Sequence, residues 1–448
     1  MSNQGQTNVV NGSGAIHPGS YIIEKALLHP SNKTEPVEIR DLIMELRIKE
    51  SLSNAYIEAQ AFLQDAGNFL SRMRLNGGER VELKIQRKKL EGSEQPEENQ
   101  KLELDLSVIE LLNYSRTHPT RQFFSLTMAS PWLVINNSKV LKRSFKGTIS
   151  SVIEKIIKND LGVERIENLN TSSKGPVQGV FPYFHPIQAA TWLLNNAYED
   201  STPFFLYETA HKGMYLDSLT KMYDKETFNT YELKSYFDNG PGKPGHYDEL
   251  SKRILKFSSP LNYSQFANIG AGVYASKGNY LDIYNKKYET KEYRYKDNLK
   301  LNKFQPFSNN ETVKDKKLNE LTDSRDYYIN LNEGSFDTPN IHSPLDKTIL
   351  KGEAQYLALN TNTMHIVING DFGLEVGNII ELEVSKASSA ETLDEANMFD
   401  KYLGGKYLVK EIETTFAEFF KQRVTIVRDS VGIDIDSSDP EEKEKSET

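Results

Sequence analysis

One eleven-residue pattern occurs early and again late in the chain, and it limits the fold more than any other feature. Residues 75–85 read LNGGERVELKI and residues 374–384 read LEVGNIIELEV, so four of the eleven positions are identical. Their alternation of apolar and polar residues is typical of a β-strand with one buried face. A polar loop and a hairpin pattern follow each copy, the hairpins at residues 108–130 and 409–430. Since single strand-turn-strand patterns resemble one another by chance, it is the shared order of the parts that predicts two related β modules.

Strand patterns surround the first copy over residues 20–130. Met44, Leu46 and Ile48 alternate with charged residues, which predicts a strand with these three side chains on one face. The segment DAGNFLSRM at 65–73 predicts a short helix within the module. The sequence therefore predicts an all-strand barrel or sandwich with one small helix.

Helical periodicity begins after this module. FKGTISSVIEKIIKNDLG at 145–162 spaces isoleucine and valine three and four residues apart, with Thr148 or Ser150 as the N-cap. HPIQAATWLLNNAYED at 185–200 predicts a second helix, with Pro186 in its first turn. We therefore expect a mixed α/β region between the two β modules.

A hairpin pattern follows at residues 203–223, PFFLYETAHKGMYLDSLTKMY. FFLYE and MYLDSL predict two strands joined by the turn at 210–213. Glu208 precedes His211 by three residues, so the two are either an acid/base pair of an active site or only parts of a turn. Because a hairpin turn is expected to hold them in solvent and no third group orients them, we expect neither to be catalytic.

Patterns are weaker from residue 240 to 350. The segment 261–288 is strand-like and rich in tyrosine. The run at 286–303 has seven basic and three acidic residues with tyrosines between them, so it either stacks on single-stranded nucleic acid or forms an exposed strand. The acidic chain favours the exposed strand. The tail at 434–448 is acidic without apolar periodicity, which predicts disorder.

Composition and motifs exclude several classes of site. The chain has no cysteine, so disulfides and thiolate chemistry are excluded, and its formal net charge of -9 disfavours general binding to phosphates. No apolar run is long enough to span a membrane, and residues 1–20 do not resemble a signal peptide. The P-loop, dinucleotide, HExxH and GxSxG motifs are absent. No catalytic residue, cofactor site or metal site is therefore predicted.

Five stretches of the sequence together resemble the baseplate hub proteins of contractile-tailed, T-even-like phages, a family related to tail-tube proteins. These stretches lie at residues 145–162, 185–223, 254–288, 370–384 and 405–430. Each is a pattern of apolar positions and glycines, and the resemblance rests on their combination. The Gly/Asn-rich segment at 1–20 and the acidic loop at 88–103 depart from the family's pattern.

The resemblance implies a mainly β fold with an α+β insert, in which two related tail-tube-type β-barrel modules flank a mixed α/β middle region. The implied division is a flexible arm at 1–19, a first barrel at 20–130, an α/β region at 131–202 continued by a middle insert at 256–352, a second, discontinuous barrel at 203–255 and 353–430, and a disordered acidic tail at 431–448. In this division the hairpin at 203–223 supplies two strands of the second barrel.

The resemblance also implies a function without catalysis. The chain would form a homotrimeric, pseudo-six-fold ring that adapts the hexameric tail tube, or a tube-initiator protein, to the trimeric central spike. Its axial channel would admit the tape measure protein and later DNA, in transient passage without sequence-specific binding or membrane insertion. The protein would be made in the host cytoplasm and reside in the tail baseplate of the virion.

Two alternatives of other classes stay open at this point. The first is a tail-associated cell-wall hydrolase, a glycosidase or peptidase, because an acidic chain offers many carboxylate pairs. The second is a carbohydrate-binding tail module, for which exposed tryptophans are expected, whereas the chain has only Trp132 and Trp192. Wall-degrading activity of the isolated chain would separate the first alternative from a structural hub.

Overall fold

The computed structural model describes most of the chain. The described residues are 17–30, 35–75, 77–88, 100–168, 176–195, 197, 202–234, 246–258, 265–283, 286–295, 301–302, 312–313, 316–317, 324–330, 345–360, 362–386, 399–400 and 402–430. The predicted arm as far as residue 16 and the predicted acidic tail at 431–448 lie outside them.

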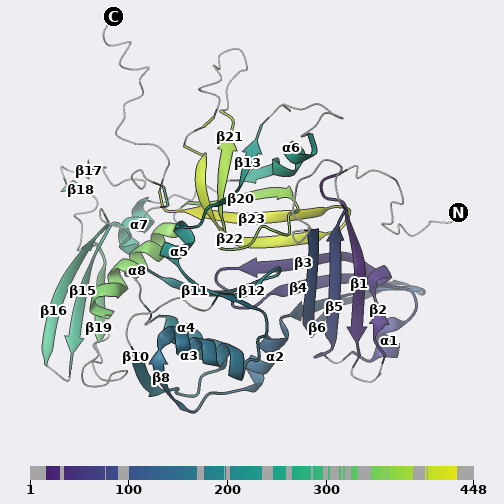
Figure 1. Cartoon of the computed structure of the whole chain (residues 1–448), viewed down its shortest axis with the longest axis horizontal. Helices are drawn as coiled ribbons and strands as arrows, with labels where there is room; N and C mark the ends of the chain where they lie inside the picture. Colours follow the sequence, from purple (N-terminus) through teal and green to yellow (C-terminus); the bar gives the residue numbers. More distant parts are fainter. Residues whose placement is uncertain are drawn as a thin grey trace, which may run out of the picture.

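Thirteen of the described strands form one continuous sheet that runs through both predicted modules (Figure 1). The first module contributes β1 (Tyr21–His29), β2 (Val37–Glu38), β3 (Ile43–Ser51), β4 (Glu58–Asp65), β5 (Arg80–Arg87), β6 (Lys101–His118) and β7 (Arg121–Ala129). The second contributes β13 (Thr227–Leu233), β14 (Ile254–Ser258), β20 (Asn362–Asn369), β21 (Ile379–Val384), β22 (Gly405–Phe416) and β23 (Phe420–Arg428). The fold is therefore mainly β, as the sequence predicts.

The order of strand pairing is the same in the two modules. The first reads β5-β6-β7-β4-β3 and the second β21-β22-β23-β20-β14, with equivalent strands in the same order along the chain. Every contact in both series is antiparallel. Beyond them, β1 pairs antiparallel with β5, whereas β13 pairs parallel with β21. The repeat that the sequence shows around β5 and β21 thus extends to the topology of both modules.

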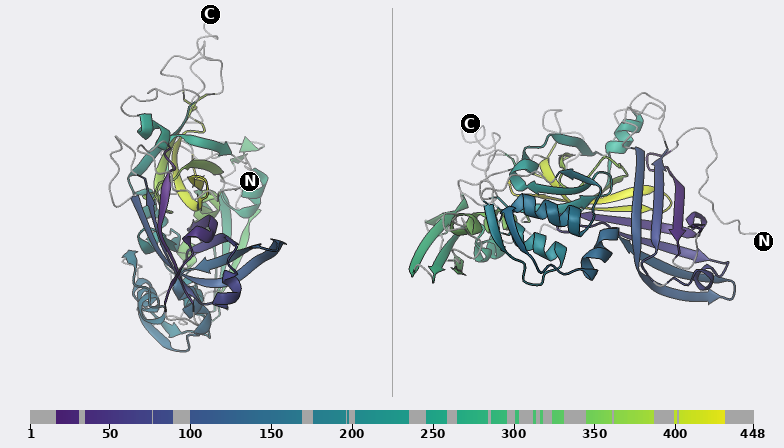
Figure 2. Two further views of the ribbon diagram at one scale, coloured as in Figure 1. Left: turned by 90° about the vertical axis from the view of Figure 1, so that its right-hand side faces the viewer. Right: turned by 60° about the horizontal axis from the view of Figure 1, so that its bottom comes forward.

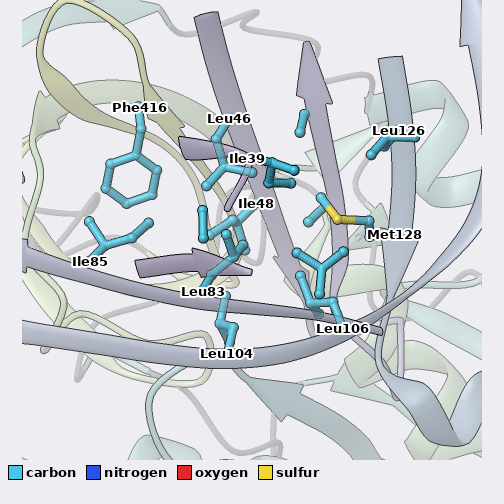
Figure 3. Packing of buried hydrophobic residues seen from close by; sticks show 14 of the residues in the cluster. Ile39, Leu46, Ile48, Leu83, Ile85, Leu104, Leu106, Leu126, Met128 and Phe416 are labelled. Atoms are coloured by element: carbon cyan, nitrogen blue, oxygen red, sulfur yellow. The ribbon is translucent and has the colours of Figure 1, made fainter. Parts of the chain in front are cut away.

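The modules join where β22 pairs antiparallel with β3, from Glu411 opposite Ser51 to Phe416 opposite Leu46. Phe416 belongs to the second module, yet it packs in the core of the first, beside Leu46 and Ile85 (Figure 3). A separate core fills the second module around Ile366, among other residues of β20 to β23. The two modules consequently share one sheet while keeping two cores.

The predicted buried face of β3 is only partly correct. Leu46 and Ile48 are buried, but the side chain of Met44 is 55% exposed. The pairing of β3 with β4 shifts register between Ile43 and Glu45, so Met44 is the extra residue of a β-bulge. A bulge changes which face the preceding side chains occupy, and period-two counting along one strand does not detect it.

The hairpin at 203–223 forms as predicted, but it lies outside the thirteen-stranded sheet. It consists of β11 (Phe204–Thr209) and β12 (Gly213–Ser218), and β12 also pairs parallel with β9 (Ile166–Asn168). We expected this hairpin to supply two strands of the second barrel. That expectation is wrong, because the hairpin pairs with β9 and not with the described strands of the second module. Tyr207 and Tyr215 face the core of the second module, while Leu206 and Leu216 face the core of the α/β region. Because both of its faces are covered, the hairpin acts as a layer between two cores.

The α/β region packs below the hairpin in Figure 1. It contains α2 (Pro131–Ser138), β8 (Ser144–Thr148), α3 (Ile149–Lys155), the π-helical turn η3 (Ile156–Asp160), β10 (Pro176–Val180) and α4 (Pro186–Leu194). The side chain of Thr148 accepts a hydrogen bond from Ser151 N, which confirms it as the N-cap of α3. Pro186 occupies the first turn of α4, as predicted.

The middle insert lies at the opposite end of the molecule from the first module in both Figure 1 and the right view of Figure 2. It contains α7 (Gln265–Ala271), β15 (Ala275–Asp282), β16 (Lys287–Arg294), β17 (Thr312–Val313), β18 (Lys316–Lys317), β19 (Asp326–Asn330) and α8 (Leu345–Leu359). The strand-like interpretation of 261–288 is correct for β15 and wrong for α7. A short apolar run fits either structure, and here the segment packs as a helix against α8.

Short helices complete the described elements. They are the 3-10 turn η1 (Arg40–Leu42), α1 (Phe69–Met73), α5 (Leu219–Tyr223) and α6 (His246–Lys252). The helix predicted at 65–73 is α1, and it buries Phe69 and Met73 against the first module.

Candidate functional site

The turn between β11 and β12 sets the position of both residues that the sequence singles out. Thr209 pairs with Gly213, so the turn comprises residues 210–212. Gly213 has a φ of 102°, and a Cβ atom there would lie 2.4 Å from the carbonyl oxygen of Arg165. Only glycine tolerates both conditions, so this turn is built to approach the backbone at Arg165 closely.

Glu208 is buried, contrary to the expectation that the turn holds it in solvent. The residue is 9% exposed, and its Oε2 accepts hydrogen bonds from Ser130 Oγ at 2.5 Å and from Ile57 N at 3.2 Å. It lies within β11, which is covered on both faces, rather than in the turn itself. The prediction failed because exposure of a strand residue depends on what packs over the strand.

His211 is half-buried and does not form a pair with Glu208. No hydrogen bond joins the two side chains in the described part of the structure, and the carbonyl oxygen of His211 accepts a hydrogen bond from the guanidinium of Arg165. The structure thus separates the two residues that the sequence places three positions apart. That neither is catalytic stays a prediction.

Two further buried carboxyl groups accompany Glu208. Glu50, at the end of β3, is 5% exposed, and Glu375, which follows β20, is 3% exposed. Glu375 accepts hydrogen bonds from Thr209 Oγ1 at 3.0 Å and from the phenol of Tyr215 at 3.3 Å. Glu50, Glu208 and Glu375, which we call the carboxyl cluster, come from the first module, the hairpin and the second module.

Burial changes the protonation of the carboxyl cluster. Desolvation raises the pKa of Glu50 to about 8, and the negative charge of Glu375 adds to this effect. Desolvation also raises the pKa of Glu208 to about 7, against the hydrogen bond from Ser130, which favours the ionised form. Lys212 Nζ lies 3.5 Å from Glu375 Oε2 and offers it a positive charge. At neutral pH the cluster therefore holds Glu50 largely in its neutral form.

Glu208 and Ser130 also line an open cavity of about 830 Å³. Its walls come from β5 and β6 on one side and from α2 and the loop at 161–165 on the other. The charged residues of the lining are Lys25, Glu82, Lys84, Glu103, Asp105, Glu164, Arg165 and Glu208. A carboxyl group whose pKa is close to neutral can give or take a proton at neutral pH. The cavity thus places one such group among several acidic and basic side chains.

Other candidate groups do not assemble into a site. Within the described ranges, no three His, Asp or Glu side chains are grouped so that they could hold a metal ion. Among the same residues, no helix has the length and apolar character that crossing a membrane requires. The aspartates of the tail, at positions 434, 436 and 439, lie outside the described residues.

Both tryptophans belong to the α/β region. Trp132 is 5% exposed. Trp192 is partly buried and packs edge-on against the rings of Phe145, Phe181 and Phe184 beside the core of the α/β region. The structure thus uses Trp132 in this core and packs Trp192 against it.

Sequence reasoning missed Glu50, Ser130 and Glu375. A signal for Glu50 was present, because Leu46 and Ile48 are buried and period two continues to Glu50 on the same face. No comparable signal exists for Ser130, directly after β7, or for Glu375, in the connection between β20 and β21, since each is buried by elements distant in the sequence.

Comparison with solved structures identifies the fold. No family model matches the sequence, and no curated protein matches it. The tail protein from Neisseria meningitidis MC58 matches with a TM-score of 0.52 at 10% identity, over 92% of this chain and 98% of that chain. The 43 kDa tail protein of prophage MuSo2 from Shewanella oneidensis matches with a TM-score of 0.51 at 9% identity, over 92% of this chain and 99% of that chain. These matches confirm the mainly β fold class and show, at the level of fold, a likeness to proteins of phage tails.

Proposed function

We propose that this chain is a structural hub of a contractile phage tail baseplate. Three copies form a ring with pseudo-six-fold symmetry that adapts the hexameric tail tube, or a tube-initiator protein, to the trimeric central spike. The observation that carries the proposal is the pairing order β5-β6-β7-β4-β3, which recurs as β21-β22-β23-β20-β14 in the same chain. The likeness of the fold to two tail proteins supports it.

Symmetry is the physical reason why a repeated module suits this role. A closed homo-oligomer presents each surface of its chain once per subunit, so a trimer of single modules offers three equivalent surfaces. A hexameric tube presents six. Two similar modules per chain give six similar surfaces in a trimer, and the remaining, unrepeated parts of the chain keep the three-fold symmetry that a trimeric spike requires.

The sheet supplies strand edges for assembly. The described hydrogen-bonding order ends at β14 and β2. An isolated parallel bridge between Glu232 of β13 and Arg253 brings the start of β14 next to β13, so β2 is the more open of the two ends. Unpaired strand edges attract further strands and are usually covered in native assemblies. In the proposed ring, edges of the first module of one copy face edges of the second module of the next.

The ring encloses an axial channel through which the tape measure protein and later DNA pass without sequence-specific binding. The formal net charge of -9 agrees with transient passage, because an acidic wall does not retain phosphates. The protein is made in the host cytoplasm and resides in the virion tail baseplate, and this role needs no cofactor, metal or catalytic residue.

Native mass spectrometry of the purified chain tests the proposal. We expect an assembly of three times the 51.0 kDa chain mass, which binds one trimeric spike when the phage's own spike protein is added. A mixture with the tube protein should give rings of six tube subunits on one hub trimer. A chain that assembles only as a dimer, or a trimer that binds neither protein, would show that the adaptor function is wrong.

A cell-wall hydrolase is a second candidate because Glu208, whose pKa is raised to about 7, lines the 830 Å³ cavity. The test is release of soluble fragments from purified peptidoglycan by the isolated chain. Activity that disappears in Glu208→Gln and persists in Glu164→Gln, a residue of the same cavity, would establish the enzyme. Under the hub proposal, none of the three proteins releases fragments.

A further inference from the structure

The sheet of the middle insert exposes one face on which tyrosines gather. β15 pairs antiparallel with β16 and parallel with β19, and among the described strands both outer ones are edges of this sheet. Tyr328 is 80% exposed, Tyr288 62% and Leu281 42%. Tyr280, on the opposite face, is 1% exposed. The sheet thus has a buried inner face and an outer face that shows aromatic rings to solvent.

The strand register arranges the outer face in three rows. Leu281 lies opposite Tyr288 in the first row, and Asn279 lies between Thr290 and Tyr328 in the second. Lys277 lies between Glu292 and Asp326 in the third. We call these residues, together with Arg294, the tyrosine face. From the usual spacings within a sheet, the Cα atoms of Tyr288 and Tyr328 are about 12 Å apart.

The ring of Tyr288 is fixed in position by hydrogen bonds beneath it. Its phenol donates to Asn279 Oδ1 at 2.9 Å, and Thr290 Oγ1 donates to the same oxygen at 3.1 Å. Asn279 itself is only 5% exposed, because its neighbours cover it. A ring that is held before binding loses little conformational entropy when a ligand stacks on it.

The charges of the tyrosine face balance. Lys277 and Arg294 carry two positive charges, and Glu292 and Asp326 carry two negative ones. The lysines of the basic run that belong to β16, at positions 287 and 291, lie on the opposite face of the sheet by the same register. A polyphosphate chain needs a surplus of positive charge, which this face does not have. The balance favours a neutral ligand rich in hydroxyl groups.

We propose that the tyrosine face binds a neutral glycan chain. The apolar C–H faces of pyranose rings cover Tyr288 and Tyr328, because a flat aromatic surface gains most from a flat apolar one. The hydroxyl groups of the sugar hydrogen-bond to Lys277, Glu292 and Asp326, and hydrogen bonds to charged groups are the stronger kind. Two tyrosines on one open face fit several successive sugars of a chain, whereas small ligands are usually enclosed in a cavity.

Titration calorimetry on the full-length chain tests this inference. The probes are chitohexaose, cellohexaose and maltohexaose as neutral hexasaccharides, a hyaluronan hexasaccharide as an acidic one, and a ten-residue oligothymidylate as a nucleic acid. We expect saturable binding of at least one neutral hexasaccharide, and weaker or no binding of the acidic sugar and of the oligonucleotide. Failure of all three neutral sugars, or preference for the oligonucleotide, would overturn the proposal.

Variants locate the binding. We expect Tyr288→Ala and Tyr328→Ala each to weaken the binding roughly five- to tenfold, and Tyr328→Phe to retain it, since stacking needs the ring and not the phenol. The control is Tyr183→Ala, because Tyr183 is 71% exposed in the α/β region. Because Tyr328 is largely exposed, Tyr328→Ala should fold even if Tyr288→Ala does not, and it then decides the outcome. If both alanine variants leave sugar binding unchanged, or change only the oligomeric mass, the tyrosine face is not a glycan site.

Discussion

Ser130 Oγ donates a hydrogen bond of 2.5 Å to Glu208 Oε2 and also accepts one of 3.0 Å from Ile57 N. Ser130 follows β7 of the first module, and Glu208 lies on β11 of the hairpin. All three groups are buried, so this network links the first module to the hairpin. The hairpin in turn lies between the core of the second module and the core of the α/β region. Its loss should affect the stability of the whole chain rather than one surface.

Ser130→Ala should destabilise the protein by about 1–3 kcal/mol, because it removes two buried hydrogen bonds and leaves Glu208 less satisfied. Thermal unfolding followed by circular dichroism would measure the change. The control is Ser251→Ala, since Ser251 Oγ donates to Asp248 O at an exposed site. Equal effects of the two substitutions would contradict the role assigned to Ser130.

Glu50 should make the protein less stable at alkaline pH. The unfolded carboxyl ionises near pH 4.5, whereas the folded one stays protonated until about pH 8, so ionisation favours the unfolded chain. The contribution of Glu50 to the free energy of unfolding is therefore fully present below pH 4.5 and is lost as the pH rises through about 8. The groups that face Glu50 are Glu375, Glu208 and the N–H of Ala210.

Glu50→Gln removes this ionisation and should raise the stability at pH 9 by about 2–4 kcal/mol, with little change at pH 5. Urea unfolding at the two pH values would measure it, with the exposed Glu110→Gln as the control. If the stability of the wild-type protein and that of Glu50→Gln change by the same amount between pH 5 and pH 9, Glu50 does not have the predicted effect.

Gly370 and Gly352 make a matched pair of glycine substitutions. A Cβ atom at Gly370 would lie 2.2 Å from ring carbons of Phe420, which is fully buried and stacks on Phe372 and Phe416. Gly370→Ala should therefore cost about 1–3 kcal/mol by overpacking. A Cβ atom at Gly352, within α8, meets nothing within 4 Å, so Gly352→Ala should stabilise by about 0.5–1 kcal/mol. The measurement is the melting temperature of each variant. If Gly370→Ala and Gly352→Ala shift it in the same direction, the prediction is wrong.

The junction of the two modules depends on apolar contact rather than on its ion pair. Lys49 Nζ lies 3.3 Å from Glu411 Oε1 across β3 and β22, with both side chains about a third or more exposed. Lys49→Ala should cost less than about 1 kcal/mol, whereas Ile412→Ala, at a fully buried position of β22, should cost about 2–5 kcal/mol. Chemical denaturation would compare them. A larger loss from Lys49→Ala would show that the ion pair dominates.

The sequence by itself determined the local elements and the repeat. Period two identified β5 and β21 and the hairpins after them, and the spacing of isoleucines identified α3 with Thr148 as its cap. These features depend on residues close together in the chain, where side-chain direction follows directly from backbone geometry. The absence of cysteine likewise settled the question of disulfides.

Only the tertiary structure decided which strands are neighbours and which polar side chains are buried. β22 pairs with β3 although more than 350 residues separate them, and Phe416 consequently enters the first core. Glu208 is buried because two cores cover both faces of β11, and Met44 is exposed because of a bulge against β4. Strand pairing uses backbone groups that every residue carries, and burial depends on distant segments, so neither leaves a local mark in the sequence.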